Sequence, residues 1–140
     1  SGDYLACFDL ESNALCKISG NGDLNNTNGQ YGTLSDRRVK ENIVDANSQW
    51  DDIKNIKIVN YNLINNDLTQ IGVIAQQVET ICPGLVKTSN DSTKVNNIEI
   101  ENLKTFKSSI LYMKSVKALQ EAMQRIEQLE SRLNELEHLF

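Results

Sequence analysis

The chain has 140 residues, of which 39% are hydrophobic and 6% aromatic. It therefore has room for one ordinary domain, or for a small domain with an extension, around a modest core. The formal net charge is −5 and the isoelectric point about 4.9, which argues against binding nucleic acid by neutralising its phosphates. No apolar run approaches the roughly 20 residues of a membrane-spanning helix, and the N-terminus lacks a signal-peptide pattern, so we expect a soluble chain without a membrane partner.

The cysteines and the histidine do not predict a metal site. Cys7, Cys16 and Cys82 form no Cys-x-x-Cys pair, and the single histidine, His138, lies near the C-terminal end. These spacings do not suit zinc. We therefore expect no metal and no cofactor, and we interpret the cysteines as buried or idle thiols in a reducing compartment.

Residues 1–34 are predicted to form a short β region followed by loose turns. The segments "YLACFDL" and "ALCKIS" alternate apolar and polar side chains, the first only in part, as short half-buried strands do. The segment "GNGDLNNTNGQYGT" gathers glycine, asparagine and aspartate, which is typical of turns and loops. This change in composition predicts a boundary after residue 34, and the opening Ser-Gly suggests one piece of a longer polypeptide.

Residues 35–102 are predicted to form a small α+β domain. "NSQWDDIKNI" suits a short helix with Asn47 or Ser48 as its N-cap and with Trp50 and Ile53 on one face. "IKIVNYNLI" and "LTQIGVIA" suit two paired strands that are joined by a turn at "NND". "AQQVETIC" suits a helix that is stopped by the only proline in the chain. "GLVKTS" and "VNNIEI" suit two further strands, joined by the loop "NDSTK".

Residues 103–140 are predicted to form one long amphipathic helix, because apolar residues recur mostly at spacings of three or four. These residues are Leu103, Phe106, Ile110, Met113, Val116, Leu119, Met123, Ile126, Leu129, Leu133, Leu136 and Phe140. The last of them follow the heptad steps of a coiled coil, after a register shift between Ile126 and Leu129. Such a helix cannot cover its apolar side alone, so we expect it to self-associate; packing against its own domain is the alternative. The mixed apolar residues do not distinguish a dimer from a trimer.

The segment "TLSDRRVKEN", residues 33–42, permits two interpretations. In the first, Ser35 or Asp36 caps a helix that begins at Arg37. In the second, Ser35 is a nucleophile and Lys40 its general base, with burial favouring the neutral amine. Five residues along a regular helix separate two side chains by about 140°. A working pair therefore needs a bend or a strand between the two residues, or a lysine from a neighbouring chain.

A set of motifs in a fixed order resembles one family. The motifs are "LSDRRVKENI", "NYNL", "QIGVIAQQVE", a proline with "GLV", and a long terminal helix. They resemble the C-terminal intramolecular chaperone domain of bacteriophage tailspikes and tail fibres, an auto-processing serine peptidase family that includes the endosialidase chaperones. The resemblance implies a homotrimer that helps the β-rich fibre ahead of it to fold and then cuts itself off. Processing would occur in the host cytoplasm, and the fibre would end in the virion tail.

With this resemblance, the expected fold is α+β in three parts. Residues 1–34 would be the distal end of the fibre, residues 35–102 the auto-processing domain, and residues 103–140 a helix that forms a trimeric coiled coil. The upstream fibre segment of the same polypeptide would then be the partner of the domain, together with two further copies of the chain.

The resemblance places the cut between Leu34 and Ser35, with Ser35 and Lys40 as the matching serine and lysine. We expect an N-to-O acyl shift at the carbonyl of Leu34 and hydrolysis of the resulting ester, with an ordinary acyl-enzyme as the alternative. Asp36 would orient Lys40 or pair with an arginine. Gln76 is a candidate oxyanion donor, or it makes a structural hydrogen bond. Whether Lys40 acts in its own chain or in a neighbour stays open.

Two other classes of function also stay open. A non-catalytic trimerisation module would use Ser35 as a helix cap and would leave the chain whole. A coiled-coil adaptor that binds an unrelated helix would be a monomer when it is purified alone.

Overall fold

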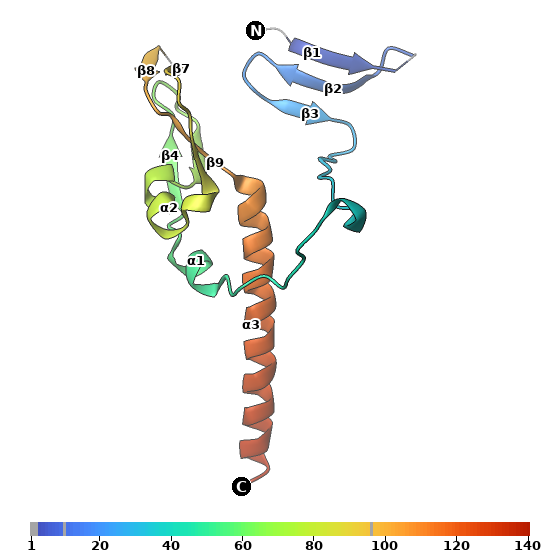
Figure 1. Cartoon of the computed structure of the whole chain (residues 1–140), viewed down its shortest axis with the longest axis vertical. Coiled ribbons are helices and arrows are strands. Elements are labelled where there is room, and N and C mark those ends of the chain that lie inside the picture. The colour runs from blue at the N-terminus through green and yellow to red at the C-terminus, as the bar shows by residue number, and fades with distance from the viewer. Residues whose placement is uncertain (1–2, 10, 96) are drawn as a thin grey trace. The chain divides into compact units, whose positions relative to one another are not determined.

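The computed structural model describes residues 3–9, 11–95 and 97–140 (Figure 1). The chain divides into two compact units, one that extends up to Val44 and one that runs from Asp45 to Phe140. The predicted α+β class, with short strands and a long C-terminal helix, is confirmed. No helix in the described ranges is long and apolar enough to cross a membrane. The predicted domain boundaries after residues 34 and 102, and the trimeric coiled coil, stay predictions.

The first unit contains a three-stranded antiparallel sheet in the order β1-β2-β3. Its strands are β1 (Asp3–Phe8), β2 (Ala14–Ser19) and β3 (Leu24–Asn26). The first two confirm the sequence prediction, whereas β3 lies in the segment predicted as a loop. Gly22, with a φ of 91°, makes a tight turn that returns the chain along β2, so that Leu24 pairs with Ile18. None of the described side chains of this sheet is buried.

The second unit combines short strand pairs with three helices. The pairs are antiparallel and join β4 to β5, β6 to β9, and β7 to β8. In chain order the elements are α1 (Trp50–Asn55), β4 (Val59–Asn62), β5 (Thr69–Gly72), α2 (Ala75–Ile81), the 3₁₀ turn η2 (Pro83–Leu85), β6 (Val86–Thr88), β7 (Thr93–Val95), β8 (Ile98–Ile100), β9 (Lys104–Phe106) and α3 (Ser108–Glu137). The β4–β5 hairpin and helix α2, followed by Pro83, confirm the sequence prediction.

Two segments of the second unit differ from the prediction. The end of the predicted loop "NDSTK" instead forms part of strand β7. Residues 98–100 of the predicted strand "VNNIEI" do form a strand, β8, which pairs with β7. The long helix was predicted from residue 103 but begins at Ser108, because residues 104–106 form strand β9. Phe106 lies opposite Val86 of β6 and packs on the core. Tertiary packing of this aromatic ring therefore overrides the helical spacing of the apolar residues.

The core of the second unit consists of very few residues. Ile56, Val78 and Leu85 form one buried cluster, and Leu85 has no exposed surface. Six partly buried side chains pack against this cluster: Val73, Ile81, Cys82, Val86, Phe106 and Leu111. Helix α3 thus meets the core through Leu111, close to the N-terminal end of the helix. Ala118 is its only buried residue.

Most of the apolar side of α3 is uncovered in the single chain. We call its exposed apolar residues the α3 stripe: Ile110, Met113, Val116, Leu119, Met123, Ile126, Leu129, Leu133 and Leu136. Their exposed fractions range from 43% for Ile110 to 67% for Met113. Packing against its own domain, the alternative considered from the sequence, therefore accounts for another side of the helix but not for the stripe.

We predict that Leu85→Ala lowers the free energy of unfolding by about 2–5 kcal/mol, because it leaves a cavity in a core of three residues. Urea denaturation of the full chain, followed by circular dichroism at one fixed protein concentration, measures the change. Leu68→Ala is the matched control, since Leu68 is 64% exposed, and it is expected to have little effect. Equal losses for the two variants would contradict this description of the core.

Candidate functional site

Ser35 and Lys40 lie on either side of a single 3₁₀ turn, η1 (Arg37–Val39). The backbone is extended at Asp36 and again at Lys40, so the turn bends the chain between two extended residues. As a result, the ammonium of Lys40 donates a hydrogen bond to the hydroxyl of Ser35 at 2.7 Å, within the same chain. This is the bend that the sequence required for a working pair. The catalytic roles of the two residues stay predictions.

Asp36 fixes the turn. Its carboxylate accepts a hydrogen bond from the backbone N–H of Arg38 at 2.8 Å, and two more from the Arg38 guanidinium at 3.0 and 2.8 Å. The Arg38 guanidinium and N–H hold the pKa of Asp36 below its usual value. The N-cap is therefore Asp36, so the capping interpretation is confirmed in its Asp36 form, and its other form, with Ser35 as the cap, is wrong. Asp36 pairs with Arg38, which leaves the Ser35 hydroxyl available to Lys40.

The residues around the predicted scissile bond are exposed. Leu34 is 76% exposed, and Ser35 and Lys40 also face solvent. A lysine takes a proton from serine only as the neutral amine, and desolvation favours that form. The single chain supplies no such burial at Lys40. Gln76, the candidate oxyanion donor, is an exposed residue of α2 in the other compact unit, and its role stays a prediction.

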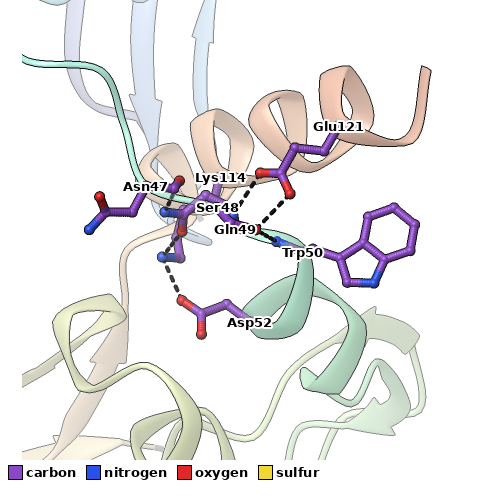
Figure 2. Close-up of polar contacts among 7 residues, drawn as sticks. All are labelled: Asn47, Ser48, Gln49, Trp50, Asp52, Lys114 and Glu121. Atoms are coloured by element: carbon purple, nitrogen blue, oxygen red, sulfur yellow. Dashed lines mark hydrogen bonds and ion pairs between the residues drawn. The ribbon is translucent and has the colours of Figure 1, made fainter. Parts of the chain in front are cut away.

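A second polar cluster joins the start of the second unit to α3, and Figure 2 shows its side chains. The carboxylate of Glu121 on α3 accepts hydrogen bonds from the Ser48 hydroxyl at 2.7 Å and from the Gln49 N–H at 2.9 Å. Lys114 lies about two helical turns before Glu121 on α3. It forms an ion pair with Asp52 at 2.8 Å and also donates a hydrogen bond to the side-chain oxygen of Gln49. We call these five residues the α1–α3 clamp.

The clamp corrects the predicted start of α1. The sequence suggested Asn47 or Ser48 as the N-cap, but the cap residue is Gln49, which makes no side-chain cap bond of its own. Glu121 instead accepts from the N–H of Gln49 across more than 70 residues of sequence. Arg125, one turn further along α3, lies over the ring of Trp50 at 3.7 Å and adds a cation–π contact. Segment 48–52 is thereby fixed along the helix.

The charges of the clamp change each other's titration. The Lys114 ammonium holds the pKa of Asp52 below its usual value, and Asp52 raises the pKa of Lys114. Hydrogen bonds from Ser48 and Gln49 likewise lower the pKa of Glu121. The contacts of the clamp hold segment 48–52 against α3, and we assign the clamp a structural role. Among the described residues, no group of His, Cys, Asp or Glu side chains is placed to hold a metal ion.

Comparisons with known proteins relate part of this chain to a known family and to two proteins. Residues 35–87 match a family model described as "Chaperone of endosialidase". The chain is 35% identical over 100 residues to the long tail fiber protein Gp37 of Salmonella phage S16, an alignment that covers 61% of the chain. It is also 30% identical over 113 residues to the Myelin gene regulatory factor-like A protein of Dictyostelium discoideum, with 71% of the chain covered.

The fold and the match together define a small α+β chaperone domain that is followed by a long helix. Residues 35–87 match the endosialidase chaperone family, and the resemblance drawn from the sequence motifs is confirmed. The matched segment begins at Ser35 and includes Lys40 and Gln76. The chain spans only 12% and 13% of the lengths of the two relatives, so what those whole proteins do is not transferred by the match alone.

Acidification should weaken the α1–α3 clamp. Because the folded-state pKa values of Asp52 and Glu121 are lowered, their stabilisation is complete above the unfolded values of about 3.9 and 4.3 and is lost as the pH falls through the lower folded values. Thermal unfolding midpoints measured between neutral and acidic pH should therefore fall less steeply for the double variant Asp52→Asn with Glu121→Gln than for the parent. Glu127→Gln, which removes an exposed carboxylate of α3, is the control. Parallel curves for parent and double variant would count against the clamp.

Proposed function

We propose that the chain is an intramolecular chaperone that forms a homotrimer, assists the folding of a phage tail fibre and then releases itself by cleavage between Leu34 and Ser35. The observation that carries the proposal is the 2.7 Å contact between Lys40 and Ser35 at the first residues of the family match. The similarity to a long tail fiber protein supports the fibre as the partner.

The proposed reaction uses only groups of this chain and water. The neutral amine of Lys40 takes the proton of the Ser35 hydroxyl as its oxygen attacks the carbonyl carbon of Leu34. The C–N bond between Leu34 and Ser35 then breaks, and the nitrogen of Ser35 takes up a proton and becomes a free amine. The acyl group has moved from nitrogen to oxygen. Water hydrolyses the ester, which gives a carboxylate on Leu34 and restores the hydroxyl of Ser35. No metal or cofactor takes part.

Assembly would prepare this site. Lys40 is exposed in the single chain, and the neutral amine requires desolvation. The α3 stripe is also uncovered, and covering it requires other copies. We infer that assembly of the trimer supplies the missing burial at the Ser35 turn, so that the serine becomes reactive only in the assembled state. A lysine from a neighbouring copy at the same serine is the variant of this scheme that the sequence left open.

The chaperone role follows from the physics of interwoven β fibres. Strand pairing between chains is slow, because the entropy of closing long loops must be overcome before the contacts form. A separate trimeric domain raises the effective concentration of the three fibre segments. Cleavage then removes the helper, so a later unfolding is hard to reverse and the product is kinetically stable. Folding would take place in the host cytoplasm and leave the fibre in the virion tail, with no nucleic acid or membrane as partner.

The runner-up function is a trimerisation module without chemistry. It shares the α3 stripe with the proposal but needs no contact between Ser35 and Lys40. The capping of η1 by Asp36 removes the structural reason that this alternative gave for Ser35. A coiled-coil adaptor for an unrelated helix is a third possibility, and it differs from both because it predicts a monomer.

Intact-mass measurement after expression tests the proposal. The parent chain should yield a fragment that begins at Ser35, whereas Ser35→Ala and Lys40→Met should stay whole at close to 15.8 kDa, because one lacks the nucleophile and the other the base. Arg37→Ala is the matched control, since it removes a neighbouring exposed cation and should leave cleavage intact. A parent chain that stays whole while it is trimeric would favour the module without chemistry, and cleavage of Ser35→Ala would refute the assigned nucleophile.

A further inference from the structure

Two thiols face each other in the sheet of the first unit. Cys7 on β1 and Cys16 on β2 are directly opposite in the antiparallel pairing, so their side chains lie on the same face of the sheet. A hydrogen bond with the Cys16 thiol raises the pKa of Cys7 above its usual value. Both cysteines are free, Cys7 is exposed and Cys16 half-buried. Of the two expectations for the cysteines, buried or idle, burial is therefore wrong for this pair.

The surrounding sheet does little to fix its own register. None of the described side chains of β1–β3 is buried, and Leu5 and Phe8 are both more than half exposed. The pairing of β1 with β2 is irregular on both sides of Cys7, with one register shift before Leu5 and another before Phe8. Register is weakly specified in strands that bury neither face. A covalent link at the regular position between two shifts would determine which residues pair.

We propose that Cys7 and Cys16 form a thiol–disulfide site that reacts with a low-molecular-weight disulfide, such as oxidised glutathione, and closes into a bridge within the chain. Opposite residues of antiparallel strands have Cα atoms roughly 4.5–5.5 Å apart, which lies within the range of about 4.4–6.8 Å that a disulfide spans. The bridge fixes the register of the β1–β2 hairpin. It makes the hairpin sensitive to the redox state of its surroundings.

The reaction balances with the oxidant named. One cysteine thiolate attacks a sulfur of oxidised glutathione, which forms a mixed disulfide and releases one reduced glutathione. The thiolate of the opposite cysteine then attacks the protein sulfur of that mixed disulfide and releases the second reduced glutathione. Two thiols of the chain are oxidised, one glutathione disulfide is reduced to two thiols, and the two protons of the cysteines end on the glutathione thiols. The proposal stands independently of the cleavage at Ser35.

The test uses the full chain in its Ser35→Ala form, so that the first unit stays attached whatever Ser35 does. The chain is equilibrated with oxidised and reduced glutathione, acid-quenched, and analysed by intact mass and by peptide mapping. We expect the mass of the chain to fall by two hydrogen atoms, with a peptide that links Cys7 to Cys16. Cys7→Ser should instead carry a glutathione adduct on Cys16, and Cys16→Ser should carry one on Cys7. Cys82→Ser, which removes the thiol of the other unit, should behave like the parent.

Amide hydrogen exchange distinguishes a disulfide that fixes the register of the hairpin from a disulfide that forms without restricting the hairpin. In the oxidised chain, exchange in residues 5–8 and 14–18 should slow by about tenfold relative to the reduced chain, because local opening of the hairpin is restricted. The single-cysteine variants should show no such change. Accumulation of glutathione adducts on Cys7 or Cys16 of the parent, or disulfides between chains, would overturn the proposal. A bridge between Cys7 and Cys16 that leaves the amide exchange unchanged would also overturn it.

Discussion

The uncovered α3 stripe is the constraint on which the rest of the structure depends. Among its described residues, the second unit has three buried core residues, and its 30-residue helix buries only Ala118. Helices in proteins owe most of their stability to tertiary packing of one face, yet nine apolar side chains of α3 stay in water. Covering each of these half-exposed side chains contributes roughly 1 kcal/mol. A shared seam between copies would therefore stabilise the unit about as much as its own core does.

A second, local constraint shapes the turn at residues 35–40. Asp36 binds both the backbone and the guanidinium of Arg38, and this pairing bends the chain so that Lys40 returns to Ser35. The contact needs only six consecutive residues and no distant element of the chain. What the single chain does not provide is burial around Lys40. In the proposed function, geometry is thus encoded locally and reactivity is supplied by assembly, which is the order that a chaperone released after folding requires.

The sequence predicted those elements whose signals are local. The strands of the β4–β5 hairpin and helix α2 carry their own periodicity and end signals, and the family motifs identified the chaperone domain. The sequence failed where distant partners decide. The apolar spacing of residues 104–106 predicts helix, but Phe106 packs opposite Val86 and the segment forms strand β9. The clamp joins Gln49 to side chains 65 and 72 positions away in the sequence. At the turn, Ser35 and Asp36 are both good capping residues, and only the pairing with Arg38 distinguishes them.

The central claim is that the chain is completed by other copies of itself, packed along the α3 stripe. Sedimentation equilibrium of the uncleaved Ser35→Ala chain at neutral pH tests it most directly, because the measured mass does not depend on shape. The account predicts a species of three chains, each of 15.8 kDa, that persists on dilution to low micromolar concentration. A folded chain that sediments at the mass of one copy, with the circular dichroism of an intact long helix, would contradict it.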